Sequence, residues 1–121
     1  MKIKPTLYID NITRQTMIID CGRVANTFWS RFKGLLGVRY LAPGDGLLIT
    51  ASNAIHTHFM FMPIDVFYVS EEHVITDIDI ALSPWRIGRP RRDACHVIEV
   101  PVGTVTRTHS MVGDELKIVT Q

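Results

Sequence analysis

Three side chains with metal-binding capacity, His56, His58 and Met60, alternate along one short stretch of the chain. In an extended strand they share one face, because side chains alternate between the two sides. Imidazole and thioether donors suit copper, and Asp65 or His96 could complete a harder, zinc-like set. The competing interpretation is a strand buried on both faces, in which methionine fills the core. We expect no metal site, and His56, His58 and Met60 are the candidates if one exists.

A second group of side chains could perform acid–base chemistry. His56, Thr57 and Asp65 are the polar residues of one apolar stretch, and Glu99 is the centre of another. A carboxylate in an apolar strand is costly to bury unpaired, so Glu99 should have a partner. One interpretation is a structural tie from Arg31 or backbone amides to Glu99. The other is a pocket in which Glu99 or Asp65 acts with His56 as acid and base. We favour the tie.

The segment 84–93 combines an aromatic side chain with four arginines, Arg86, Arg89, Arg91 and Arg92. Guanidinium groups beside an aromatic platform suit phosphate, an acidic peptide or single-stranded nucleic acid. A solvated loop is the simpler interpretation, because one short basic run supplies few phosphate contacts. We expect Trp85 to fold back on the core, and we expect no nucleic-acid partner.

The elements that must position these groups are predicted to be mainly strands. The strands are expected over 6–10, 16–20, 47–51, 55–62, 65–69, 73–80, 95–100 and 116–120. Two hairpins are expected, one of strands 6–10 and 16–20 and one of strands 65–69 and 73–80. One main helix is expected over about 27–37, with Asn26 or Thr27 as its cap and Gly37 as its end. The segment 103–111 is left open between a helical turn and a loop. Because strands and helices do not alternate, we predict an antiparallel sheet curled into a barrel or sandwich.

Length and composition agree with one small globular domain. The 121 residues are 46% hydrophobic and 21% charged, with a net charge of +1, which argues against a dedicated nucleic-acid or anionic-membrane binder. Cys21 and Cys95 are too few for a disulfide framework. With no apolar signal stretch or transmembrane run, we expect a cytoplasmic protein, or an envelope protein if the chain is a trimmed form.

Six motifs in fixed order carry a family resemblance. They are Arg31–Gly37, Gly46–Leu48, Ile55–Val66, Leu82–Arg86, Val97–Gly103 and Gly113–Asp114. Over about residues 24–119 the chain resembles the bacterial and archaeal domain-of-unknown-function family numbered 192. The resemblance implies a small compact β-rich domain and assigns no activity or site residue. The sequence departs from the family pattern at His58, a position that is usually aromatic, and at Phe61, a position that is usually basic.

These observations lead to one interpretation and one alternative. We predict a β-rich α+β single domain over 1–121, a monomer or weak dimer without a cofactor, which binds a small molecule or peptide without catalysis. The candidate ligand-binding residues are His56, Thr57, Met60, Asp65, Trp85 and Glu99. The alternative is a metal-dependent or acid–base enzyme that uses His56, Asp65 and Glu99.

Overall fold

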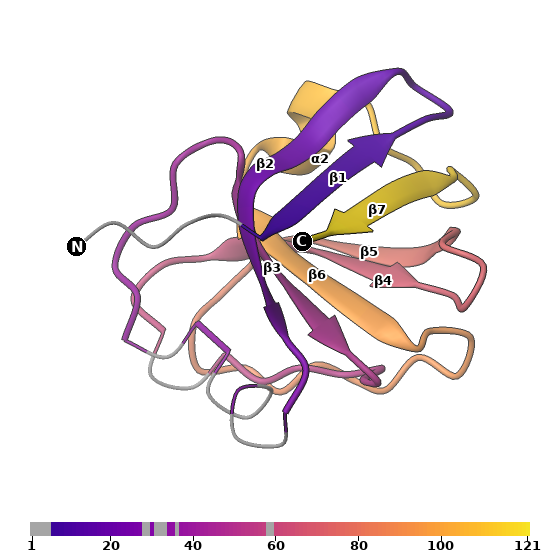
Figure 1. Ribbon diagram of the computed structural model, residues 1–121. Coiled ribbons are helices and arrows are strands. Elements are labelled where there is room, and N and C mark those ends of the chain that lie inside the picture. Colours follow the sequence, from indigo (N-terminus) through magenta and orange to yellow (C-terminus); the bar gives the residue numbers. More distant parts are fainter. Residues whose placement is uncertain (1–5, 28–29, 31–33, 36, 58–59) are drawn as a thin grey trace.

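The computed structural model describes residues 6–27, 30, 34, 35, 37–57 and 60–121. Its strands are β1 (Leu7–Asn11), β2 (Thr16–Ala25), β3 (Asp45–Thr50), β4 (Ile64–Val69), β5 (Ile75–Leu82), β6 (His96–Pro101) and β7 (Leu116–Thr120), and its helix is α2 (Thr104–Thr108). The strands form one sheet in the order β5-β4-β6-β3-β2-β1-β7. The sheet curls into a half-barrel (Figure 1), which confirms the predicted β-rich, barrel-like class.

The pairing of β2 with β3 corrects the expectation of an antiparallel sheet. These two strands are parallel, with Cys21 opposite Asp45 and Ala25 opposite Ile49, whereas the other neighbours are antiparallel. A parallel pair needs a long crossover. Residues 26–44 form this crossover. The sequence analysis did not anticipate the parallel pair.

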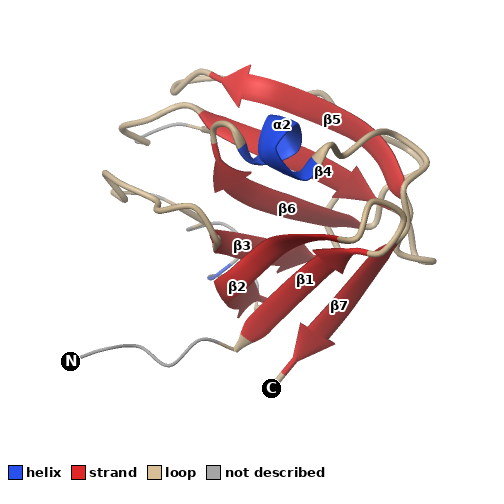
Figure 2. Ribbon diagram, turned by 90° about the horizontal axis from the view of Figure 1, so that it is seen from above, coloured by secondary structure: helices blue, strands red, loops and turns tan. Residues whose placement is uncertain are grey.

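The two edge strands approach each other at one end of the half-barrel. Val74, just before β5, forms an isolated bridge with Glu115, just before β7. The amide of Ile75 donates to the carbonyl of Asp114 over 2.9 Å, and the amide of Leu116 donates to the carbonyl of His73 over 2.8 Å. Figure 2 shows α2 lying within the curve of the sheet. These contacts close one end of the half-barrel.

The sheet carries a separate apolar cluster on each face. The inner cluster includes Ile9, Phe67 and Ile98, together with Val105 of α2. The outer cluster includes Leu47, Val66, Tyr68 and Val97 of the sheet, together with Leu35, Ile55, Met60 and Ala94 from the connections between strands. Since adjacent residues of a strand face opposite sides, β4 and β6 contribute to both clusters, and all six residues of β4 are buried. This explains the continuous apolar run of β4.

Most predicted strands are confirmed, with ends shifted by a few residues, but the predicted strand 55–62 is wrong. Within its described residues, only His56 has a β contact, an isolated bridge to Ile87. Ile55 and Met60 are buried by packing of a loop on the outer face rather than by a strand. The apolar residues of this segment are therefore apolar because the loop packs on the sheet, and they do not indicate a strand. The open segment 103–111 contains α2.

The predicted helix 27–37 includes residues 28, 29, 31–33 and 36, which lie outside the described residues. At its start, the Oγ1 of Thr27 accepts a hydrogen bond from the amide of Ser30 over 3.1 Å, as an N-cap does. The amide of Gly34 donates to the carbonyl of Ser30 over 3.0 Å, which is helical spacing. Gly34 and Gly37 have φ of 47° and 78°, both in the left-handed region, and the described residues 34, 35 and 37 lie in turns. The predicted cap at Thr27 is therefore supported, whereas the predicted end at Gly37 is three residues too late, because the left-handed conformation that follows a helix is already present at Gly34.

Candidate functional site

Glu99 lies in the middle of β6 and is buried in the outer apolar cluster. Its side chain is 2% exposed, and in the described part of the chain its Oε2 has no hydrogen-bond partner. Its cross-strand neighbours are Leu47 of β3 and Val66 of β4. Burial raises the pKa of Glu99 from its ordinary 4.5 to about 8. The carboxyl therefore holds its proton at neutral pH and can donate a hydrogen bond.

Asp65 lies on the opposite face of the sheet. It pairs with Val100, the residue after Glu99, so the two carboxyls project to different sides. Asp65 is 1% exposed, and its two oxygens accept the amides of Ala81, Gly103 and Val105 over 3.0, 3.2 and 3.0 Å. Asp65 thus joins β5 and the start of α2. The polar tie expected at Glu99 is found at Asp65.

The other described candidate residues of the loop 55–62 lie in the outer cluster or contact the loop that contains Arg86 and Ile87. Met60 is buried in the outer cluster, and His56 is half-buried beside Ile87. Thr57 is fully buried, and its Oγ1 accepts the amide of Arg86 over 2.7 Å. His58 lies outside the described residues. Because Asp65 is on the inner face, the structure does not bring the proposed acid–base set of His56, Asp65 and Glu99 together.

No group of three or more His, Cys, Asp or Glu side chains able to hold a metal ion occurs among the described residues. His96 lies instead near His73, with ring centroids 6.3 Å apart. Its Nδ1 accepts the amide of Ala51 over 3.3 Å. Burial, and then the neighbouring His73, hold the pKa of His96 below its ordinary value. The described residues therefore do not bring His96 together with the other members of the zinc-like set.

The loop 84–93 departs from the expectations for it at Trp85 and Arg91. Trp85 is 57% exposed and has a φ of 65°, so its ring does not fold back on the core as expected. The side chain of Arg91 is 12% exposed and donates to Asp77 and Asp79, each over 2.9 Å. Its guanidinium lies 3.9 Å from the ring centroid of Tyr68. Arg91 is therefore a structural anchor for the loop.

A cleft of about 360 Å³ opens beside the outer apolar cluster, between β2, β3 and the segment 35–41. Its lining residues are Cys21, Gly22, Arg23, Leu35, Val38, Tyr40, Leu41, Asp45, Gly46 and Leu47. Leu35 and Leu47 belong to the outer cluster, and Val38 and Leu41 pack against it. Leu47 is also the cross-strand neighbour of Glu99. The floor is therefore apolar, with a protonated carboxyl next to it.

The rim of this cleft is polar. Arg23 is exposed and forms no ion pair within the residues described. Tyr40 is 74% exposed, whereas Asp45 is half-buried and accepts the amide of Ala42 over 2.7 Å. Sequence reasoning missed these residues because they come from three separate segments without a shared motif. The Gly46–Leu48 motif was the available signal.

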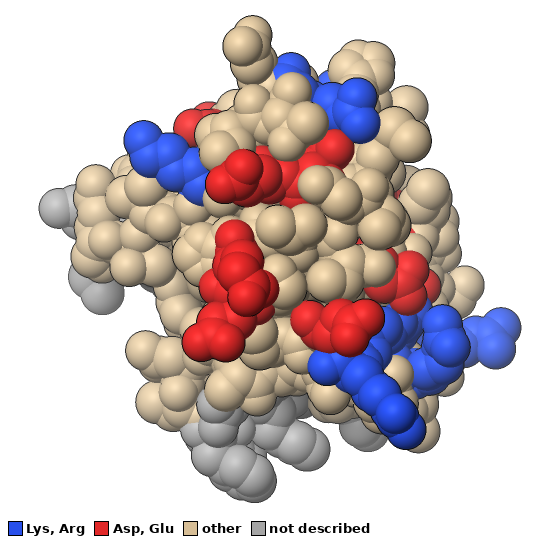
Figure 3. Space-filling view, turned by 90° about the vertical axis from the view of Figure 1, so that its right-hand side faces the viewer, with Lys and Arg blue, Asp and Glu red and all other residues tan. Residues whose placement is uncertain are grey.

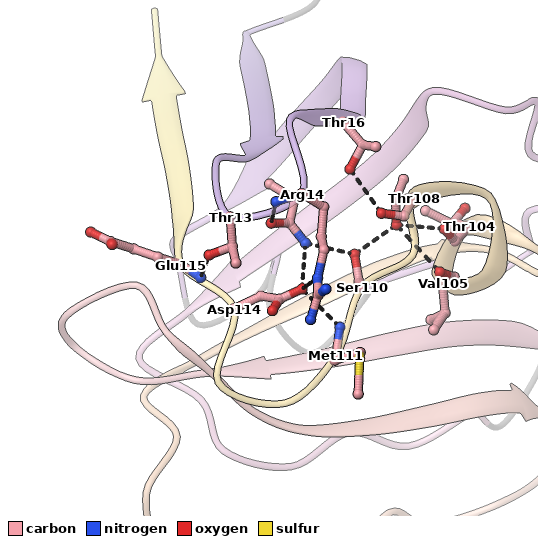
Figure 4. A network of polar contacts seen from close by, with 11 residues as sticks. Thr13, Arg14, Thr16, Thr104, Val105, Thr108, Ser110, Met111, Asp114 and Glu115 are labelled. Carbon is pink, nitrogen blue, oxygen red and sulfur yellow. Dashed lines mark hydrogen bonds and ion pairs between the residues drawn. The ribbon is translucent and has the colours of Figure 1, made fainter.

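A buried polar network closes the end of the half-barrel that holds α2 (Figure 4). The Oδ2 of Asp114 accepts the Nδ2 of Asn11 over 3.0 Å, the Nε of Arg14 over 2.9 Å and the amide of Met111 over 2.9 Å. The Nδ2 of Asn11 also donates to the Oγ of Ser110 over 3.0 Å. The network joins the β1–β2 hairpin to the segment before β7, so the Gly113–Asp114 motif contains a residue, Asp114, that accepts three of these hydrogen bonds.

A curled β half-barrel with a loop-covered outer face and an adjoining cleft defines the class of this protein. Comparison with known families gives the particular one: the profile of domain-of-unknown-function family 192, described as an uncharacterized ACR, matches residues 11–118. The chain belongs to this family.

Curated relatives agree with this membership. A UPF0127 protein of Pyrococcus furiosus is 34% identical, covering 88% of this chain and 94% of the relative. A UPF0127 protein of Thermococcus sibiricus is 31% identical, covering 78% of this chain but 63% of the relative's length.

Two solved structures show the same fold. A protein of unknown function from Novosphingobium aromaticivorans has a TM-score of 0.78 at 16% identity, covering 93% of this chain and 83% of that one. A candidate transcription regulator from Sinorhizobium meliloti has a TM-score of 0.79 at 20% identity, covering 97% of each chain. The described residues contain no helix long and apolar enough to cross a membrane.

Proposed function

We propose that this protein is a non-catalytic binding module and that its ligand is a small molecule held in the cleft between β2, β3 and the segment 35–41. The cleft itself is the observation that carries the proposal. Its volume of about 360 Å³ is at the lower end of the range of small-molecule sites, which combine an apolar lining with a few polar groups.

The residues of the cleft suggest the chemistry of its ligand. Leu35, Val38 and Leu47 would contact an apolar body. Arg23 offers a guanidinium at the rim, and guanidinium groups favour carboxylate or phosphate partners. We therefore expect a small amphipathic acid, with its apolar part inside and its anionic group toward Arg23.

A fragment screen followed by amide chemical shifts tests the proposal. Small aromatic and aliphatic carboxylic acids should shift the amides of Val38, Leu41, Gly46 and Leu47 together. Val38→Trp should fill the cleft and abolish these shifts. Val112→Trp is the matched control, because Val112 is 59% exposed and outside the cleft lining, and it should leave them intact. Shifts at other residues, or none from any acid tested, would contradict the proposal.

A further inference from the structure

Three large apolar side chains are exposed on two loops that backbone hydrogen bonds connect, and the amides of Met60 and Trp85 donate to the same carbonyl, that of Thr57. Phe61 is 53% exposed, Trp85 is 57% exposed and Ile87 is 79% exposed. The backbone joins the loops through a short ladder: the amide of Thr57 donates to the carbonyl of Arg86, and the amide of Gly88 donates to the carbonyl of Ile55, both over 2.7 Å. An exposed apolar group of this kind is typical of a binding surface.

The turn that presents Trp85 is held in place by buried hydrogen bonds. The Oγ1 of Thr57 donates to the carbonyl of Ser83 over 2.7 Å and accepts the amide of Arg86 over the same distance. The carbonyl of Thr57 accepts the amide of Trp85 over 2.9 Å. Trp85 has a φ of 65°, a left-handed backbone conformation that is costly for residues other than glycine. The fold thus stabilises a strained turn that holds the backbone of Trp85 in place and leaves the residue 57% exposed.

Arginines accompany two of these apolar side chains, Phe61 and Trp85. The guanidinium of Arg39 lies 4.3 Å from the ring centroid of Phe61, and Arg86 directly follows Trp85. Both are exposed, and neither forms an ion pair in the described portion of the chain. The side chain of Arg89 is 79% exposed and is 3.9 Å from Asp77. We call Arg39, Phe61, Trp85, Arg86 and Ile87 the aromatic–arginine surface.

We propose that the aromatic–arginine surface binds an acidic peptide segment in which a large apolar side chain is flanked by Asp or Glu. The apolar side chain would pack on Trp85 and Ile87, and the flanking carboxylates would pair with Arg39 and Arg86. This proposal stands independently of the cleft and its ligand.

An acidic peptide fits this surface better than a nucleic acid does. Asp77 and Asp79 lie beside the same loop and use the charge of Arg91. Acidic side chains also gather on the face shown in Figure 3, with Lys and Arg side chains at its margins. A nucleic acid needs a run of phosphate contacts, whereas this surface offers only Arg39 and Arg86 without an ion pair among the described residues. A short peptide needs two cationic contacts and one apolar one.

Fluorescence polarisation of a labelled octapeptide, Glu-Asp-Phe-Glu-Asp-Leu-Glu-Asp, tests the proposal with the full chain. We expect saturable binding that weakens about tenfold in Trp85→Ala and about tenfold in Arg86→Glu, as for hot-spot residues. Matched controls are Met111→Ala, at a residue that is 57% exposed, and Lys117→Glu, at an exposed residue of β7. Both controls should bind the peptide as the unmodified protein does.

Two further probes complete the experiment. The same peptide with lysine in place of each acidic residue should not bind, and a thymidylate dodecamer should bind more weakly than the acidic peptide. The proposal is overturned if the acidic peptide shows no saturation at about 1 mM, if Trp85→Ala and Arg86→Glu bind as well as the controls, or if the oligonucleotide binds more tightly.

Discussion

The sheet buries two carboxyl groups, those of Asp65 and Glu99, in two different environments. Asp65 of β4 accepts three backbone amides on the inner face, so its two oxygens are satisfied by hydrogen bonds. Glu99 of β6 lies among apolar side chains on the outer face with an unpartnered Oε2, counting the described residues. Desolvation favours its neutral form. The two residues should therefore respond differently to substitution.

Glu99→Gln should remove a pH dependence from the free energy of unfolding. In the native protein the pKa of Glu99 is raised to about 8, so its proton is retained on folding. The associated stability is complete below the ordinary pKa of 4.5 and is lost as pH rises from 4.5 to 8. Between pH 4.5 and 7 the loss should be on the order of 3 kcal/mol, and the glutamine variant should not show it.

Urea unfolding across this pH range measures the effect. The matched control is Glu115→Gln, at an exposed residue, which should follow the pH profile of the unmodified protein. If Glu99→Gln also follows that profile, Glu99 is ionised inside the protein and the assignment of a neutral carboxyl is wrong.

Asp65→Asn should destabilise the protein at neutral pH by about 2–3 kcal/mol. The amide side chain has one acceptor oxygen in place of two, so it cannot accept the amides of Ala81, Gly103 and Val105 together. Urea unfolding at pH 7 gives the magnitude, and the amide shift of Val105 locates the change. Asp93→Asn, at an exposed residue, is the control. Equal stability of the two variants would contradict a structural role for Asp65.

At the scale of elements, the sequence was informative where local pattern and burial coincide. The strand Leu116–Thr120 was predicted with the bounds that the structure has, since its β-prone residues directly follow the turn-forming pair Gly113 and Asp114. The loop 55–62 was misassigned because a loop that packs on the sheet can have the same apolar pattern as a buried strand. The parallel pairing of β2 with β3 and the cleft beside it depend on contacts between distant segments, which no local pattern specifies.

Thr57→Val should loosen the ladder between the loops 53–57 and 86–91. Valine keeps the shape of threonine but removes the Oγ1 that bonds to Ser83 and Arg86. We expect a loss of about 1–2 kcal/mol in stability, because polar backbone groups remain buried without a partner. Hydrogen exchange at the amides of Trp85 and Arg86 should accelerate.

The matched control for this ladder is Thr120→Val, at an exposed residue of β7. It should leave exchange at both amides unchanged. Unaltered exchange in Thr57→Val would show that the strained Trp85 turn does not depend on the hydroxyl. The turn would then be held by the backbone bonds between Thr57, Trp85 and Arg86 alone.

For the whole molecule, the weakest line of the half-barrel should be the seam between its edge strands. Elsewhere neighbouring strands share full ladders, whereas β5 and β7 meet through Val74 and Glu115 and a few adjoining backbone bonds. The network around Asp114 supports that seam (Figure 4). Burial opposes ionisation of Asp114, but hydrogen bonds from Arg14, Asn11 and Met111 outweigh it and hold its pKa below the ordinary value. The stability it adds is present above pH 3.8 and lost in more acidic solution.

Asp114→Asn should therefore open the seam before it affects the rest of the sheet. We expect faster hydrogen exchange at the amides of Ile75, Gly113 and Leu116, which bond across the seam, and unchanged exchange at Leu48 and Ile98 in the centre. Stability at pH 7 should fall by about 2–3 kcal/mol, and the acid-dependent loss below pH 4 should become shallower. Glu72→Gln, at an exposed residue, should change neither property. Uniform acceleration in Asp114→Asn would instead mean that the half-barrel opens as one cooperative unit, with no separately weak seam.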